Sequence, residues 1–250
     1  MACGLGDCDE LPLADGGEGT GDVLAEVIEA ASAIPFDPAH LDPFTSSRPL
    51  GELLARVDAQ RILVGLGGTA NMDAGMGLLE VLDALPAPTT VLCDVQTTLY
   101  DAPRLYGPQK GATPEQVAEL EARFRSIERL APYARLPGSG AAGGLGAALA
   151  SLGAELVPGA AAVLDLLGFD PRPYDLVVTG EGRVDATTLE GKAPAEVARR
   201  CAAAGVPCVV VGGVVEVEVP GARTVALSGD PSRTRADLVE LGARLLDPAG

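Results

Sequence analysis

The sequence predicts an α/β protein made of two α/β domains with mostly parallel sheets. Short apolar runs rich in β-branched residues occur at 61–64, 90–93, 175–178 and 207–211, and each leads into glycine or acidic residues, as buried parallel strands do. Apolar residues at helical spacing lie between these runs. This alternation of strand, glycine turn and helix is typical of α/β folds.

Helical spacing predicts helices over 22–31, 52–57, 114–130, 145–152, 194–204 and 233–246. The helix over 114–130 has the clearest start. Thr113 is suited to the N-cap, Pro114 to the first helical position, and Glu115 places an acid in the first turn.

Two proline-containing breaks predict how the domains are divided. Residues 34–49 contain four prolines, a density that neither a helix nor a strand tolerates, and we expect a domain junction there. Residues 157–159, Val-Pro-Gly, are suited to the return crossing. We therefore expect a discontinuous Rossmann-like α/β domain of residues 1–45 and 160–250, with a shortened second α/β domain of residues 46–159 inserted into it.

Composition excludes several classes of protein. The 18 Lys+Arg and 35 Asp+Glu give a formal charge of −17, and this average field repels nucleic acid. Charged residues, proline or glycine interrupt every apolar run before the roughly 20 residues that a membrane span needs. The first ten residues lack the pattern of a signal or transit peptide, and the five cysteines include no CxxC pair, so we expect a cytoplasmic protein with reduced thiols.

Three turns combine acids with glycines. The turn 179–185 follows a predicted strand, which makes Glu181 and Asp185 candidate metal or base carboxylates; an N-capping Asp and a solvated Glu are the alternative. In the turn 14–20 the glycines also permit close approach of the backbone to a ligand, and Asp15 and Glu18 are its acids. A plain capped helix start is the alternative. The turn 67–73 is the third.

Only two of the 18 basic residues are lysines, Lys110 and Lys192, and both lie in turn-like settings. A chain that otherwise uses Arg is expected to keep Lys where a compact ammonium is needed, for example against phosphate. The loop 138–143 fits GxGxxG formally, but no apolar strand precedes it, so the dinucleotide-binding interpretation fails its context. This small-residue loop is suited either to cradling phosphate oxygens or to close helix packing.

Several separated motifs together resemble the bacterial type I glycerate kinase family. PLADGGEGT at 12–20 resembles P-M-A-D-G-G-E-G-T, VGLGGTANMD at 64–73 resembles G-x-G-G-S-A-T-N-D, and CDV at 93–95 resembles the start of C-D-V-D-N-P-L. YGPQKGA at 106–112 resembles F-G-P-Q-K-G-A, and PGSGAAGGLG at 137–146 resembles P-G-A-G-A-A-G-G-L-G. VTGEGRVD at 178–185, with Thr188 and GKAP at 191–194, resembles T-G-E-G-x-x-D-x-Q-T-x-x-G-K-x-P.

The resemblance implies two α/β domains with an active-site cleft, and ATP-dependent, Mg²⁺-assisted phosphorylation of D-glycerate to 2- or 3-phosphoglycerate. It implies that Asp15 or Asp185 orients or deprotonates the acceptor hydroxyl and that Lys110 and Lys192 neutralise phosphate or carboxylate charge. Glu181 and Asp94 would hold the metal. The implied substrate- and phosphate-binding residues are Gly16, Gly17, Glu18, Thr20, Gly68, Thr69, Asp73, Ser139, Gly140, Gly143, Gly144 and Thr188.

The sequence also departs from the family pattern. It lacks the opening motif A-P-D-S-F-K-G-S, and the spans from Thr20 to Gly67 and from Gly77 to Cys93 are short, which predicts a compact member. Gln96 and Thr97 replace an acid and an amide. A member that binds nucleotide or hydroxy acid as a regulatory or partner subunit is therefore the alternative to an active kinase of short hydroxy acids. A sheet edge left uncovered at the start favours a homodimer.

Overall fold

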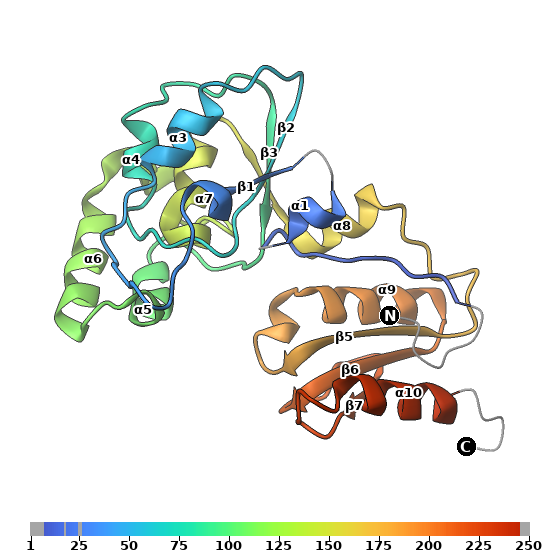
Figure 1. Ribbon diagram of the computed structural model, residues 1–250. Coiled ribbons are helices and arrows are strands. Elements are labelled where there is room, and N and C mark those ends of the chain that lie inside the picture. Colours follow the sequence, from blue (N-terminus) through green and yellow to red (C-terminus); the bar gives the residue numbers. More distant parts are fainter. Residues whose placement is uncertain (1–7, 18, 25–26, 246–250) are drawn as a thin grey trace. The chain divides into compact units, whose positions relative to one another are not determined.

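The computed structural model describes residues 8–17, 19–24 and 27–245 (Figure 1). It confirms the α/β class, because both of its sheets contain parallel strands alternating with helices. The described chain divides into two compact units, residues 13–167 and residues 8–12 with 168–245. We call them the first unit and the second unit and treat each by itself.

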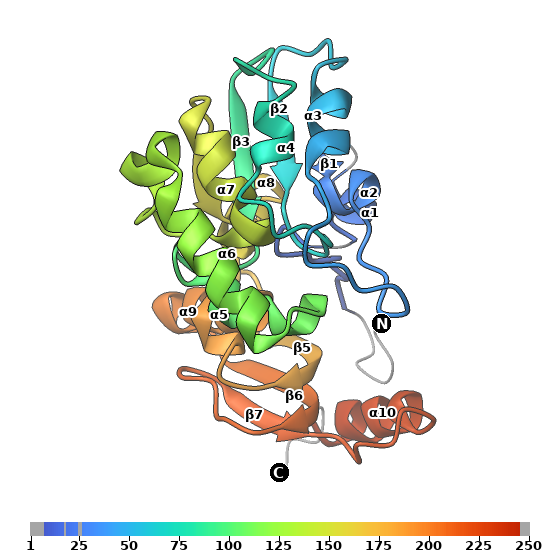
Figure 2. The same ribbon diagram turned by 90° about the vertical axis from the view of Figure 1, so that its left-hand side faces the viewer.

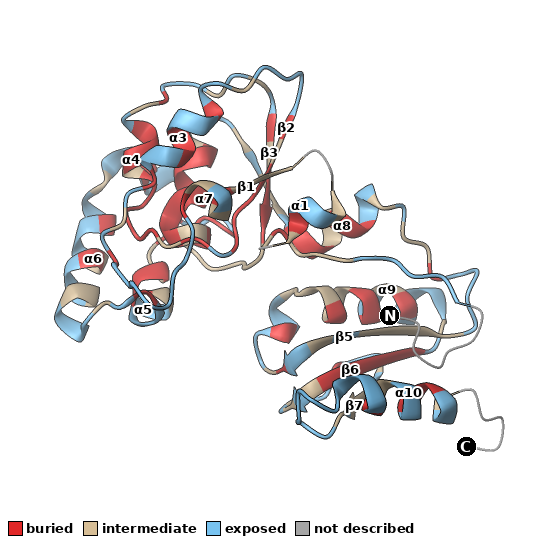
Figure 3. Cartoon of the chain, viewed as in Figure 1, coloured by how far each residue is buried: buried red, intermediate tan, exposed pale blue. Residues whose placement is uncertain are grey.

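The first unit contains a four-stranded parallel sheet in the order β1-β2-β3-β4. The strands are β1 (Ile28–Glu29), β2 (Ile62–Gly65), β3 (Thr89–Cys93) and β4 (Glu155–Pro158). The central strands β2 and β3 are almost entirely buried, because helices cover both faces of the sheet and apolar residues are needed at every position (Figure 3).

Helices surround this sheet. On one face lie α3 (Arg48–Leu54), α4 (Met76–Leu79), α6 (Pro114–Ser126) and α7 (Ala141–Ser151), and on the other lies α8 (Gly159–Leu166) (Figures 1 and 2). The shorter helices are α1 (Thr20–Val23), α2 (Ala30–Ala33), α5 (Ala102–Tyr106) and the 3₁₀ turns Pro108–Lys110 and Glu128–Tyr133. In α6 the predicted Thr113 cap forms a capping box with Gln116, and Leu120 and Phe124, one turn apart, are its buried residues.

The second unit contains a three-stranded parallel sheet, β5-β6-β7, made of β5 (Val177–Val184), β6 (Cys208–Val215) and β7 (Arg223–Ala226). The helices α9 (Ala193–Ala204) and α10 (Thr234–Leu245) cover its two faces (Figure 1). Val209 and Val211 of β6 pack with Leu241 of α10. Alternate residues of a strand point to opposite faces, so this central strand is apolar throughout.

The division into units differs from the expected one of residues 1–45 with 160–250, and 46–159. Residues 13–45 belong to the first unit because β1 pairs with β2 and because Pro35 forms an isolated bridge to Thr69. Residues 157–159 do not mark a crossing, since they join β4, which pairs with β3, directly to α8. The units instead divide after Pro12 and Leu167.

Two predicted elements also differ. Residues 22–31 do not form one helix but contain the end of α1, strand β1 and the start of α2, because Ile28 and Glu29 pair with Val64 and Gly65. The predicted turn 179–185 is mostly strand, since β5 continues to Val184.

No helix in the described ranges is long and apolar enough to cross a bilayer.

Candidate functional site

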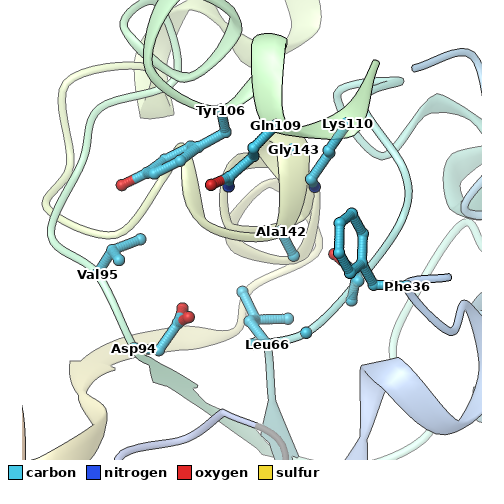
Figure 4. Close-up of a pocket in the computed structure, with 12 residues that line it drawn as sticks. Phe36, Leu66, Asp94, Val95, Tyr106, Gln109, Lys110, Ala142 and Gly143 are labelled. Atoms are coloured by element: carbon cyan, nitrogen blue, oxygen red, sulfur yellow. The ribbon is translucent and has the colours of Figure 1, made fainter. Parts of the chain in front are cut away.

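A cavity of about 200 Å³ opens in the first unit at the carboxyl ends of β2 and β3 (Figure 4). Residues 66–69 follow β2 and line one part of it, and residues 94–95 follow β3 and line another. The carboxyl ends of parallel strands are where open α/β sheets bind ligands. The remaining lining residues are Phe36, Tyr106, Gln109, Lys110, Ala142 and Gly143.

Lys110 supplies the positive charge of this cavity. It ends the 3₁₀ turn Pro108–Lys110 and is only 6% exposed. Its Nζ donates a hydrogen bond to the backbone oxygen of Asn71 at 2.7 Å. Burial lowers the pKa of Lys110 from 10.5 to about 8, while the charges of Asp94 and Asp73 act in the opposite direction. An anionic ligand would therefore stabilise the charged form of Lys110.

Asp94 enters the cavity from the side opposite Lys110 (Figure 4). It directly follows β3, and its Oδ2 would lie 2.9 Å from a Cβ placed on Gly67. A side chain at position 67 would therefore displace this carboxylate. The preceding residue, Cys93, is chemically quiet, because burial, with a smaller contribution from Asp94, raises the pKa of its thiol to about 12.

Two strained loops interlock behind the cavity. Ala74 and Ala142 have φ values of 59° and 51°, in the left-handed region that residues other than glycine rarely adopt. They are tied together by hydrogen bonds from the Ala74 N–H to the Gly143 oxygen at 2.9 Å and from Asn71 Nδ2 to the Ala142 oxygen at 2.8 Å. A Cβ on Gly143 would lie 2.1 Å from the Asn71 oxygen, so glycine is required there. The carbonyl that binds Lys110 is thereby fixed in place.

Some of the expected ligand-binding residues have structural contacts instead. Asp73 is buried and does not line the cavity; its carboxylate accepts hydrogen bonds from Ser47, Asn71, Gly75 and Gly77. These bonds hold the start of α3 against the start of α4.

Ser139, also buried, bridges the Leu99 N–H and the Ala134 oxygen. Gly140 and Gly144 permit close packing, since a Cβ would lie 2.3 Å from the Thr98 oxygen and 2.7 Å from the Ala74 Cα, respectively. The loop 138–144 therefore packs closely, and Ala142 and Gly143 are its residues that line the cavity.

The loop of Asp15, Gly16 and Gly17 lies against the turn that follows β2. Gly67 N–H donates to the Gly16 oxygen at 3.0 Å, and Gly16, with φ of 93°, leaves room for the Leu92 oxygen, which a Cβ would approach to 2.6 Å. The Asp15 carboxylate accepts from the Gly17 N–H at 3.1 Å. Thr20 is buried, with its hydroxyl donating to the Gly17 oxygen, and Glu18 lies outside the described residues.

The second unit gathers the other predicted residues at the end of β5. Thr188, fully buried, donates its hydroxyl to Glu181 Oε1 at 2.6 Å and accepts from the Asp185 N–H at 3.0 Å. Lys192 Nζ lies 3.9 Å from Glu181 Oε2. Glu181 lies within the strand rather than in a turn, because Gly180 lets β5 approach β6, where a Cβ would lie 2.3 Å from the Val211 oxygen.

Asp185 is the first residue after β5 and is oriented by its neighbours. The hydroxyl and the backbone N–H of Thr187 both donate to its Oδ1, at 2.6 and 2.9 Å. These bonds lower the pKa of Asp185, and the positive charge of Lys192 lowers it further. The carboxylate is therefore ionised at neutral pH and held in one orientation.

Nine of the predicted residues gather in two groups. Asp94, Lys110, Gly68, Thr69 and Gly143 line the cavity of the first unit, while Glu181, Asp185, Thr188 and Lys192 form the cluster of the second. The sequence did not single out the cavity residues Phe36, Tyr106 and Gln109. Tyr106 and Gln109 lie inside the motif at 106–112, which could have indicated them as site residues. Phe36 lies in the proline-rich stretch, where no motif indicates it.

Within the described ranges, no group of three or more His, Cys, Asp or Glu residues is arranged to hold a metal ion. The four cysteines of those ranges, Cys8, Cys93, Cys201 and Cys208, form no disulfide. Fold and cavity together define an α/β protein with a buried cation at the carboxyl ends of parallel strands, an arrangement suited to a small anionic ligand.

Comparison with known proteins identifies the family. A model of the glycerate kinase family matches residues 25–86 and 84–229, and the chain belongs to that family. It is 32% identical over 291 residues to glycerate kinase from Halalkalibacterium halodurans, covering 81% of this chain and 75% of the relative. It is 32% identical over 271 residues to glycerate 2-kinase from Escherichia coli, covering 75% and 71%.

Two further similarities bear on length and fold. An uncharacterised protein of Mycobacterium bovis is 35% identical over 203 residues, which cover 72% of this chain and 53% of the relative, so the chain spans about half of that protein. The crystal structure of a proposed glycerate kinase 2 from Salmonella typhimurium LT2 matches with a TM-score of 0.70 at 29% identity, covering 94% of this chain and 88% of the other.

The comparisons also support the predicted internal shortening. The 291-residue alignment is longer than this 250-residue chain. The family match is broken at 84–86, inside the short span between Gly77 and Cys93.

Proposed function

We propose that this protein is an ATP-dependent kinase that transfers the γ-phosphoryl group to a hydroxyl of D-glycerate or a related short hydroxy acid, giving 2- or 3-phosphoglycerate from glycerate. The observation that carries the proposal is the buried Lys110 in a cavity shared with Asp94, in a chain of the glycerate kinase family. Phosphoryl transfer depends mainly on positioning and on neutralising charge, and these residues are suited to both.

In the first unit, Lys110 is proposed to neutralise an anionic group of a substrate. The backbone around Gly16, Gly17, Gly68 and Gly143 leaves room for close approach of a ligand, as glycine does. Asp15, at the same edge of the sheet as residues 66–69, is one candidate for orienting the acceptor hydroxyl, because its loop hydrogen-bonds to Gly67.

In the second unit, Asp185 is the other candidate base. As the acceptor oxygen forms its bond to the γ-phosphorus, the bond from that phosphorus to ADP breaks, and the proton of the hydroxyl passes to the carboxylate. Lys192 is proposed to neutralise phosphate charge, and Thr188 to hold Glu181 in one orientation through its 2.6 Å hydrogen bond. The lowered pKa of Asp185 keeps it ionised at neutral pH.

ATP and Mg²⁺ are the proposed cofactors, and the residues suit them chemically. Mg²⁺ in phosphoryl-transfer enzymes is held by one or two carboxylates together with substrate phosphates, so a cluster of three acidic residues is not required. Asp94 and Glu181 are the proposed ligands; Asp94 acts on Lys110 through its charge, and Lys192 Nζ lies 3.9 Å from Glu181 Oε2. When bound, the metal neutralises charge on the phosphoryl oxygens.

The test is ADP release by the purified full chain with Mg²⁺ and ATP, comparing D-glycerate with L-glycerate, glycolate and no acid. The proposal predicts turnover that depends on D-glycerate or a similar acid, and ³¹P NMR of the product identifies the phosphorylated hydroxyl. The replacement of the motif's acid and amide by Gln96 and Thr97 favours a second candidate, a binding subunit without turnover. Thermal stabilisation by ATP or glycerate with no ADP release would select it.

A further inference from the structure

We propose that the cavity of the first unit binds the carboxylate and carbon chain of the acceptor acid, rather than nucleotide phosphates, and that Tyr106 sets the length of acid accepted. This inference rests on the proposed function and assigns one substrate to one set of residues. It is carried by the charge, size, walls and an unpartnered hydroxyl of the cavity.

The charge of the cavity suits a single carboxylate. Lys110 is its only lysine, and Asp94 lies in the same cavity with Asp73 close enough to affect Lys110. A triphosphate would bring several negative charges next to these two acids against one ammonium, which is unfavourable in a partly buried site. One carboxylate forms a charge-assisted pair with the ammonium, which has three N–H donors and uses one for the Asn71 oxygen.

The size and walls of the cavity suit a short carbon chain. Its 200 Å³ lies below the roughly 300–1,000 Å³ typical of sites for drug-sized ligands, the class to which a nucleotide belongs. Leu66, Val95 and Phe36 supply apolar wall. Phe36 is held there by its N–H donating to the Gly68 oxygen at 3.2 Å and by the adjacent Pro35–Thr69 bridge.

A buried hydroxyl in the cavity wall lacks a partner within the described residues. Thr69 is 4% exposed, and its Oγ1 has no hydrogen bond there. A buried polar atom without a partner costs about 1–3 kcal/mol, so native structures rarely leave one without a protein, water or ligand partner. A carboxylate or hydroxyl oxygen of an acid in the cavity would satisfy it.

Tyr106 closes the cavity with a fixed side chain. Its hydroxyl and Thr97 Oγ1 are 2.5 Å apart, and its ring lines the cavity beside Gln109, in the same segment as Lys110 (Figure 4). Both residues differ from the motifs quoted above, which have Phe at 106 and an amide at 97. The two departures are thus in direct contact, and together they set this wall of the site.

The test is calorimetric titration of the full chain with D-glycerate in the absence of nucleotide, and separately with ATP. Lys110→Met should weaken D-glycerate binding at least tenfold, the loss expected for a charge-assisted hydrogen bond. It should leave ATP binding within about twofold. Thr69→Val, close in shape to the wild type, should weaken D-glycerate binding severalfold. Arg123→Met, at an exposed position on α6, is the matched control and should change neither.

Tyr106→Ala should improve binding of a four-carbon hydroxy acid relative to D-glycerate at least tenfold. Loss of ATP rather than acid affinity in Lys110→Met would overturn the inference, as would unchanged acid binding in both Lys110→Met and Thr69→Val, or a wild-type protein that binds no short hydroxy acid. Acid binding through Lys110 without ADP release would instead refute the proposed kinase activity and leave this site intact.

Discussion

Replacing Lys110 by Met tests the electrostatic cost of burying this ammonium. Burial lowers the pKa of Lys110 from 10.5 to about 8, so the folded protein binds this proton less tightly than the unfolded chain does. One pKa unit corresponds to about 1.4 kcal/mol, so the charged Lys110 lowers the free energy of unfolding by about 3 kcal/mol at neutral pH. Stability rises with pH wherever the unfolded chain binds more protons, and the cost therefore disappears as the pH rises from about 8 towards 10.5.

The Met variant lacks this titration. At pH 7 its stability gain is partly offset, because the Asn71 oxygen loses its 2.7 Å hydrogen bond, at a cost of about 1–3 kcal/mol. That loss changes little with pH. The free energy of unfolding of the wild type, relative to the variant, should therefore increase by about 2.5 kcal/mol from pH 7 to pH 10.

Urea unfolding followed by far-UV circular dichroism measures this difference, since the chain has no Trp for fluorescence. Arg123→Met is the matched control, because arginine keeps its charge throughout this pH range and the position is exposed. The difference in free energy of unfolding between Arg123→Met and the wild type should stay constant. A Lys110→Met difference that also stays constant between pH 7 and pH 10 would refute the electrostatic reasoning.

The other predictions concern separate parts of the chain. Thr187→Val removes the hydroxyl that lowers the pKa of Asp185, so if Asp185 is the base, kcat/KM should fall at a higher pH on the acid side; an unshifted profile contradicts this role. Asp73→Asn should lower the free energy of unfolding by at least about 2 kcal/mol in urea, because an amide nitrogen cannot accept from Ser47; wild-type stability would contradict it. In the described residues β1 pairs only with Val64 and Gly65, which leaves β2 without a strand beside Ile62 and Leu63, and an uncovered edge favours a homodimer; a monomer mass by light scattering at micromolar concentration argues against it.

Position in the sheet explains which strands the sequence missed, although the edge strand β5 was predicted from the apolar run 175–178. Strands β2, β3 and β6 are central, buried on both faces, and appear in the sequence as continuous β-branched runs. The strands that were missed, β1, β4 and β7, are all edge strands, in which partial exposure permits residues such as Glu155 and Arg223. The local sequence pattern predicts an edge strand poorly, because its conformation depends on pairing with a single neighbouring strand.

The same limit applies to the glycine-rich segments. The sequence predicts a turn over 179–185 because Gly180 and Gly182 are poor strand formers. Most of these residues form strand, because Gly180 and Gly213 let β5 and β6 approach closely. The sequence predicts a helix over residues 22–31, because apolar spacing alone does not distinguish one helix from two short helices that flank a strand. In both cases a tertiary pairing overrides the local preference.

For the candidate site, the motifs indicated candidate residues but not the contacts that each of them makes. Thr69 and Asp94, in the turns after β2 and β3, line one cavity with Lys110, which ends a 3₁₀ turn. The sequence could not show that the Asp73 carboxylate is occupied by hydrogen bonds from four residues of its own unit, because those donors come from separate segments. Ionisable residues in a motif divide into structural and ligand-facing ones only when their partners are known.

The structure explains why position 110 is a lysine rather than an arginine. An arginine there would bring a bulkier, planar group into a cavity of about 200 Å³ and would need partners for five N–H donors. Lysine concentrates its charge at one atom that can bind a carbonyl on one side and an anion on the other. Because burying it lowers stability while no anion is bound, a bound carboxylate should both stabilise the fold and raise the pKa of Lys110. Acid binding is therefore expected to take up protons above about pH 8, and calorimetry in buffers of different ionisation enthalpy measures that uptake.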